Sequence, residues 1–82
     1  MAVSSAGVDL LRVRVHAHRE LPDPAGRRAA RENAGIAVRE LAEALGVSRQ
    51  CVAQWEAGSR VPRGELLVRY VEALKIMQEA GE

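Results

Sequence analysis

The sequence predicts a small all-α protein, built as a compact bundle of about five short helices. Its 82 residues are enough for one domain. Aromatic residues make up only 2% of the chain and hydrophobic residues 48%, so the core must consist mainly of Ala, Val and Leu. A small β-sandwich would require more aromatic and β-branched side chains. Apolar residues also recur at three- and four-residue spacing, which favours helices.

Length and composition exclude several classes of protein. No apolar run approaches the roughly 20 residues that a membrane-spanning helix requires, and no secretory signal is expected at the N-terminus. Cys51 is the only cysteine, so an internal disulfide is excluded and a cytoplasmic location is expected. The chain is too short for an enzyme with its own substrate domain, and no cofactor is expected.

Three segments are expected along the chain. Residues 1–8 are small and polar and predict a flexible tail. Residues 9–24 predict an additional N-terminal helix, capped by Asp9 and followed by a proline linker. Apolar residues at every second position over 13–17 also permit a strand, although we favour the helix. Residues 25–82 predict the main domain.

Four further helices are expected in the main domain. Turn residues mark their ends, because Gly46 ends one helix, Ser48 caps the next and Gly58 ends it. The last helix carries apolar residues at the spacing of one helix face. These helices are expected at residues 25–33, 38–45, 49–57 and 64–79.

Basic side chains are concentrated in the first three-quarters of the chain. Residues 1–63 hold ten basic and seven acidic side chains, whereas residues 64–82 hold two basic and four acidic ones. Eleven of the twelve basic residues are arginine, whose planar group can donate two parallel hydrogen bonds to phosphate or guanine. This pattern is compatible with nucleic-acid binding, although a GC-rich genome would produce the same preference for arginine.

The most informative segment is residues 38–58, which predicts two short helices joined by a tight turn at 46–48. Ala42 lets the two helices approach closely, and Gly46 can adopt the positive φ angle that closes the first helix. The apolar residues expected to hold the pair in place are Leu41, Leu45, Val47, Val52 and Trp55. The outward side of the second helix is expected to be formed by Arg49, Gln50, Ala53 and Gln54, with Ser48 at its start.

An ordered set of residues around this segment resembles the lambda-repressor/Cro-type, or Xre-type, helix-turn-helix DNA-binding proteins of phages and bacteria. The resemblance covers about residues 27–74. It implies a lambda-repressor-like bundle of four or five helices, whose second motif helix lies in the DNA major groove. The residues that carry it are Arg31, Gly35, Leu41, Ala42, Gly46, Val47, Ser48, Val52, Glu56, Gly58 and Pro62.

The resemblance implies base-reading roles for Arg49, Gln50 and Gln54. Arginine can donate twice to guanine, and glutamine can both donate to and accept from adenine. Ser48 matches a position where a phosphate or a thymine methyl contact is expected. The alternative is that these residues form an ordinary solvated helix face.

The resemblance also implies contacts to the DNA backbone and one internal ion pair. Arg39 and Arg60 match positions that contact phosphates, and Arg63 matches one that contacts a phosphate or the minor groove. Solubility alone is the alternative role for each. Arg31 and Glu56 match a pair that forms an internal salt bridge in the family, so a structural role is expected for them.

This sequence departs from the family pattern in its first half. Ala37 and Val38 replace the usual Ser or Thr followed by Gln, so the backbone N–H groups at this helix start are expected to be free to hold phosphate. Arg27 and Ala30 stand where larger apolar residues are usual, which leaves the core short of volume. The additional N-terminal helix is expected to supply that volume through Leu10, Leu11, Val15 or Leu21.

Other signals do not indicate a metal site or catalysis. His16 and His18 point to different sides of a helix, and on a strand they would lack a third metal ligand. Cys51 predicts a half-buried core thiol, with redox sensing as the alternative. The loop over residues 58–64 lacks the Gly-Lys-Ser/Thr ending of a phosphate loop. No catalytic combination of residues is present, so an enzyme is not expected.

The sequence therefore predicts a sequence-specific double-stranded DNA-binding transcriptional regulator, such as a small phage or bacterial repressor of the Cro-like or immunity type. A homodimer on a two-fold symmetric operator is expected, and Val68 and Ile76 of a continuous last helix could serve its contact. One alternative is an antitoxin-type regulator that also binds a protein partner through the last helix or the tail. The other is a protein–protein adaptor whose helix-turn-helix has lost DNA binding.

Overall fold

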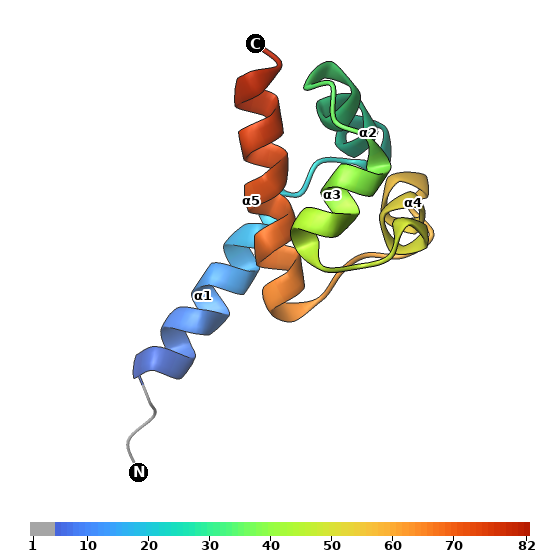
Figure 1. Ribbon diagram of the computed structural model, residues 1–82. Coiled ribbons are helices and arrows are strands. Elements are labelled where there is room, and N and C mark those ends of the chain that lie inside the picture. Colours follow the sequence, from blue (N-terminus) through green and yellow to red (C-terminus); the bar gives the residue numbers. More distant parts are fainter. Residues whose placement is uncertain (1–4) are drawn as a thin grey trace.

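Residues 5–82, the part of the chain that the computed structural model describes, form five helices and no strand (Figure 1). The predicted all-α fold class is therefore confirmed. Within these residues, no helix is both long enough and apolar enough to span a membrane. The helices are α1 (Ser5–Glu20), α2 (Pro24–Asn33), α3 (Val38–Leu45), α4 (Arg49–Ala57) and α5 (Gly64–Ala80).

The boundaries of α2 and α4 follow from local structure. Asp23 caps α2, because its Oδ1 accepts a hydrogen bond from the Gly26 N–H at 2.8 Å, and Pro24 supplies a preset φ angle at the first helical position. Gly58 ends α4 with a φ angle of 79°. A Cβ atom on Gly58 would lie 2.8 Å from Cγ of Pro24, so glycine also allows the end of α4 to approach α2 closely.

α1 is longer than the sequence predicts. It begins at Ser5, so Asp9 lies inside the helix and does not cap it. Residues 5–8 are helical instead of forming a tail, and they make up the first turn of α1. The rest of the expected tail, residues 1–4, lies outside the described residues. The strand that residues 13–17 permitted is not formed.

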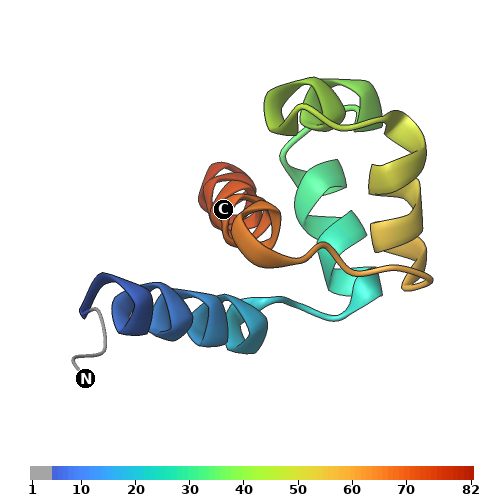
Figure 2. The same cartoon turned by 90° about the horizontal axis from the view of Figure 1, so that it is seen from below.

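α5 is the central helix of the bundle. α2 and α3 pack against it, and α1 packs on another side (Figures 1 and 2). α4 packs mainly on α2 and α3 and reaches α5 through the ring of Trp55. The larger cluster of buried side chains joins α5 to α2, α3 and α4, and within it the ring centroids of Trp55 and Tyr70 lie 4.7 Å apart. The buried members of this cluster are Ala30, Leu41, Ala42, Leu45, Val52, Trp55, Tyr70, Leu74 and Met77.

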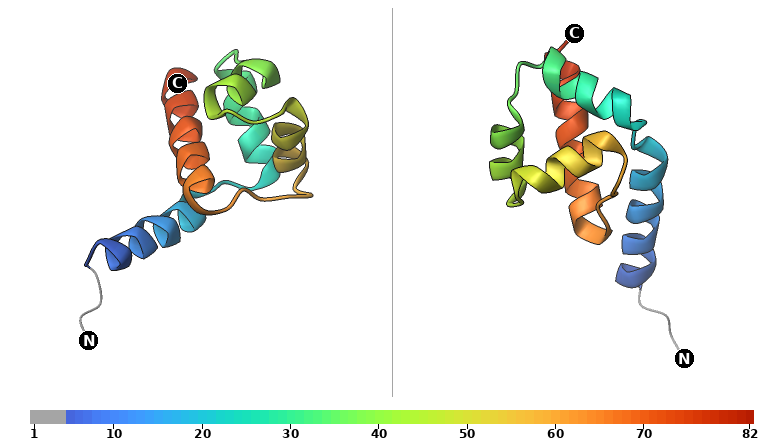
Figure 3. Two further views of the ribbon diagram at one scale, coloured as in Figure 1. Left: turned by 60° about the horizontal axis from the view of Figure 1, so that its bottom comes forward. Right: turned by 90° about the vertical axis from the view of Figure 1, so that its right-hand side faces the viewer.

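A smaller cluster joins α1 to α5. Ala17 packs with Leu67 and Val71, and Glu20 forms an ion pair with Lys75. The first half of α1 extends away from the other helices (Figure 3). α1 is therefore attached to the bundle by its second half.

The expectation that α1 supplies the missing core volume is largely wrong. Leu10, Leu11 and Val15 are exposed, and Leu21 is the one of the four that packs against the core. The physical reason is that α1 reaches the bundle only near its C-terminal end. The side chain of Arg27 fills part of the space instead, since it is only 7% exposed.

Deleting residues 1–21 is expected to lower Tm, because the deletion uncovers Leu67 and Val71. Burying an aliphatic side chain of this kind contributes about 2 kcal/mol to stability. Thermal unfolding followed by circular dichroism measures the change. Leu11→Ala is the control, because this side chain is 62% exposed and its removal should leave Tm nearly unchanged. An unchanged Tm in the shortened chain would show that α1 does not stabilise the bundle.

Tyr70→Phe is expected to stabilise the protein. The Tyr70 hydroxyl is buried and has no hydrogen-bond partner among the described residues, and an orphaned group of this kind costs about 1–3 kcal/mol. Burial also raises the pKa of Tyr70 from 10.0 to about 12. Because the unfolded chain ionises first, this tyrosine leaves stability unchanged below pH 10 and lowers it as the pH rises from 10 through 12.

Urea unfolding of the wild-type protein and Tyr70→Phe, from about pH 8 to about pH 12, measures both effects. The free energy of unfolding should fall less steeply in the phenylalanine variant at the alkaline end. A variant that is less stable than the wild type near pH 8 would contradict the cost assigned to the buried hydroxyl.

Candidate nucleic-acid interface

Backbone and side-chain hydrogen bonds hold the turn between α3 and α4. Gly46 ends α3 with a φ angle of 71°, and the Val47 N–H donates to the Ala42 carbonyl at 3.0 Å. Ser48 caps α4, because its Oγ accepts a hydrogen bond from the Cys51 N–H at 3.1 Å. These contacts set the direction in which α4 leaves the turn.

α4 presents polar side chains at the surface. Val52 and Trp55 are buried on its inner side. Arg49 and Gln50 are exposed, and Gln54 is partly exposed. The three side chains predicted to read bases therefore lie at the surface of one helix, which base readout requires. Contact with a base remains a prediction for each of them.

The four residues predicted to contact the DNA backbone are all exposed. Ser48 Oγ accepts the hydrogen bond that caps α4, which leaves its hydroxyl hydrogen available to donate. Arg39 lies in the first turn of α3, Arg60 lies in the loop after α4, and Arg63 lies directly before α5. Within the described part of the chain, these arginines form no ion pair. Their guanidinium groups are therefore available, and their phosphate contacts remain predictions.

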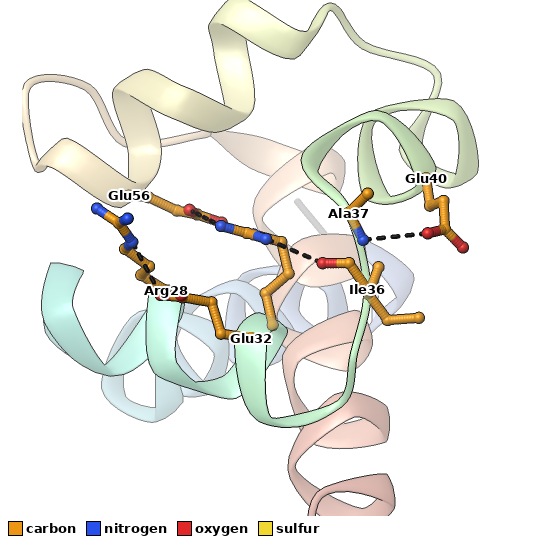
Figure 4. Close-up of polar contacts among 7 residues, drawn as sticks. Arg28, Glu32, Ile36, Ala37, Glu40 and Glu56 are labelled. Carbon is orange, nitrogen blue, oxygen red and sulfur yellow. Dashed lines mark hydrogen bonds and ion pairs between the residues drawn. The ribbon is translucent and has the colours of Figure 1, made fainter.

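One N–H group at the start of α3 is occupied by a side chain, although the sequence predicts that these groups are free. Ala37 has no side-chain acceptor, but the Glu40 carboxylate accepts a hydrogen bond from the Ala37 N–H at 3.1 Å (Figure 4). The Glu40 carboxylate places a negative charge at this helix N-terminus, where such a charge is favoured. Within the described residues no side chain caps the N–H groups of the first turn of α3, so a phosphate contact there stays a prediction.

An ion pair connects α2 to α4 (Figure 4). Arg31 donates from Nε to Oε2 of Glu56 at 2.6 Å and from Nη2 to Oε1 at 2.9 Å. Its Nη1 donates to the Ile36 carbonyl at 2.9 Å. The hydrogen bonding with Glu56 raises the pKa of Arg31 above its usual value, so the arginine stays charged. This pair fixes the position of α4 against the helix that precedes the motif.

Arg27 is a buried arginine that also contacts α4, and the sequence analysis did not identify this role. Its Nε donates to the Pro22 carbonyl at 2.7 Å, and its Nη1 donates to the Trp55 carbonyl at 2.9 Å. The Trp55 carbonyl lies in the last turn of α4 and also accepts a hydrogen bond from the Gly58 N–H at 3.3 Å, so Arg27 is its second donor. The sequence held one signal of this role, because Arg27 is charged and the family usually has an apolar residue at its position.

The two histidines and the cysteine do not gather into one site. His18 and Cys51 line one groove, whereas His16 lines a different groove between α1 and α5. Cys51 is a partly buried free thiol. Within residues 5–82, no group of three or more His, Cys, Asp or Glu side chains could hold a metal ion.

The two helices α3 and α4, their tight turn and the polar surface of α4 define a helix-turn-helix protein. A helix-turn-helix family model matches residues 28–76, which is more than half of the chain. The chain belongs to this family, and it is a DNA-binding protein of the Cro, or Xre, type. α1 lies outside the matched residues. The comparisons with curated proteins and with solved structures found no match.

Arg31→Ala is expected to destabilise the protein by about 3–5 kcal/mol, because it leaves the Glu56 carboxylate buried without its partner. Arg28→Ala is the matched control on the same helix. Arg28 pairs with Glu32 at the surface, and an exposed pair of this spacing contributes about 0.5 kcal/mol or less. Urea unfolding of both variants measures the difference. Two equally small losses would contradict a structural role for the Arg31 pair.

Proposed function

We propose that this DNA-binding regulator is a repressor that recognises a specific double-stranded operator with α4 in the major groove. The observation that carries the proposal is the exposed polar surface of α4, held in place by a buried inner side. An α-helix about 10–12 Å across fits a major groove about 12 Å wide. Occupation of the operator would then block access of RNA polymerase to the DNA.

Each exposed polar residue around the motif has a role in this proposal. The side chains on α4 read base edges, and the flanking residues hold phosphates. Arg63 contacts either a phosphate or the minor groove. The base-reading residues are Arg49, Gln50 and Gln54, and the other backbone contacts are Arg39, Ser48 and Arg60.

A homodimer on a two-fold symmetric operator is part of the proposal. Of the two residues expected to serve the contact, Val68 packs against the α1–α5 cluster and Ile76 is 59% exposed. α1 exposes further apolar side chains that a second copy could cover, namely Val8, Leu10, Leu11, Val13 and Val15. Sedimentation of the purified chain with its operator measures the stoichiometry. One copy of 8.9 kDa per operator would contradict the dimer.

Two experiments test the proposed function. The first selects the sequences that the protein binds from a random duplex pool, and the second titrates a selected duplex at several salt concentrations. The selected duplexes should share a sequence arranged as an inverted repeat. The logarithm of the affinity should fall with the logarithm of salt concentration, with a slope of about −0.9 for each phosphate neutralised. A reporter gene behind the selected site should be transcribed less. An adaptor that has lost DNA binding would show no sequence preference at any salt concentration.

Arg49→Ala is expected to relax sequence preference at one base pair, at a cost of about 1–3 kcal/mol on the preferred duplex. The reason is that a base contact discriminates between sequences, whereas a phosphate contact does not. Arg69→Ala is the matched control, because Arg69 is exposed on α5 and lies outside the motif. Equal weakening on all sequences by Arg49→Ala would contradict its base-reading role.

A further inference from the structure

An open groove of about 760 Å³ runs along one flank of α4. Cys51 and Gln54 of α4 form one wall, and the loop after α4 contributes Arg60 and Arg63. His18 of α1 also lines it. We call this feature the basic groove. It brings a residue of α1, which lies outside the family match, next to residues of the helix-turn-helix motif.

The charge of the basic groove has one sign. Its lining includes His18, Arg60 and Arg63 but no aspartate or glutamate. The groove of about 440 Å³ between α1 and α5 differs, because His16 shares it with Glu72 and with the ion pair between Glu20 and Lys75. His16 therefore has acidic side chains in its groove, whereas the charged neighbours of His18 in the basic groove are all arginines.

A helix that lies in the major groove has the sugar–phosphate backbones on both of its flanks. The helix is about 10–12 Å across and the groove about 12 Å wide, so little space separates the helix flanks from the phosphates. Gln54 is predicted to read a base and also lines the basic groove. The surface immediately beyond Gln54 is thus the one that a flanking backbone would meet.

We propose that the basic groove receives the DNA backbone beside the base-reading helix, and that His18 donates a hydrogen bond to one of its phosphates. The inference rests on the proposed function and extends the DNA contact to α1. An imidazole offers an N–H donor in its neutral form and two in its charged form, so it can bind a phosphate oxygen in either state. A phosphate contact of this kind strengthens binding on every sequence alike.

Four proteins test this inference: the wild type, His18→Ala, His18→Arg and the matched control His16→Ala. Their affinities for the selected operator and for an unrelated duplex are measured from about 50 to about 200 mM salt, the range over which phosphate contacts are most visible. Both histidines are exposed, so the variants should keep the wild-type Tm. His18→Ala should weaken binding about ten- to a hundredfold on both duplexes, as expected for loss of one hydrogen bond to a charged group.

His18→Arg should restore the affinity and make the salt slope steeper by about 0.9, because it adds a full charge beside a phosphate. His16→Ala should bind like the wild type. Wild-type affinity and slope in both His18 variants would overturn the role of His18 while leaving the proposed function intact. Equal weakening by His16→Ala and His18→Ala would also overturn it. If the wild-type chain binds no duplex, both the proposed function and this inference are contradicted.

Discussion

The orientation of α4 depends on the burial of its inner side against the rest of the bundle. Val52 is completely buried, and the ring of Trp55 packs against Tyr70 of α5 with 4.7 Å between the centroids. An α-helix has 3.6 residues per turn, so burying these two positions directs the residues on the opposite side outward. Gln50 and Gln54 are accessible for this reason. The usable surface of the motif is therefore a consequence of core packing.

Two arginines complete the attachment of α4, of which Arg27 is buried and Arg31 is partly buried. Arg31 binds the carboxylate of Glu56, and Arg27 binds the carbonyl of Trp55, so both contacts hold α4 through oxygen atoms in its second half. Buried charges are tolerated only when such partners compensate for lost hydration. Because hydrogen bonds of this type require a defined geometry, they restrict how α4 can sit on α2. Hydrophobic contacts alone would be less directional.

Local signals were sufficient to predict most of the helices. The expected bounds of the last four helices agree with the structure to within one residue, because turn glycines, helix caps and prolines act over a few neighbouring positions. α1 was less well predicted. Its apolar residues identify a helix but do not say which of them will be covered, and Leu11 remains exposed whereas Ala17 is buried. The same limit applies to Glu40, whose contact with the Ala37 N–H was not expected.

The amino-acid sequence by itself determined the order of the helices, the tight turn before Ser48 and the polar surface residues of α4. It also contained enough family-specific residues to indicate a helix-turn-helix DNA-binding protein. Only the tertiary structure decided that Arg27 is buried, that α1 extends from the bundle and that His18 lies in the basic groove. The physical reason is that helix formation depends on nearby residues, whereas burial depends on contacts between elements that are distant in the chain.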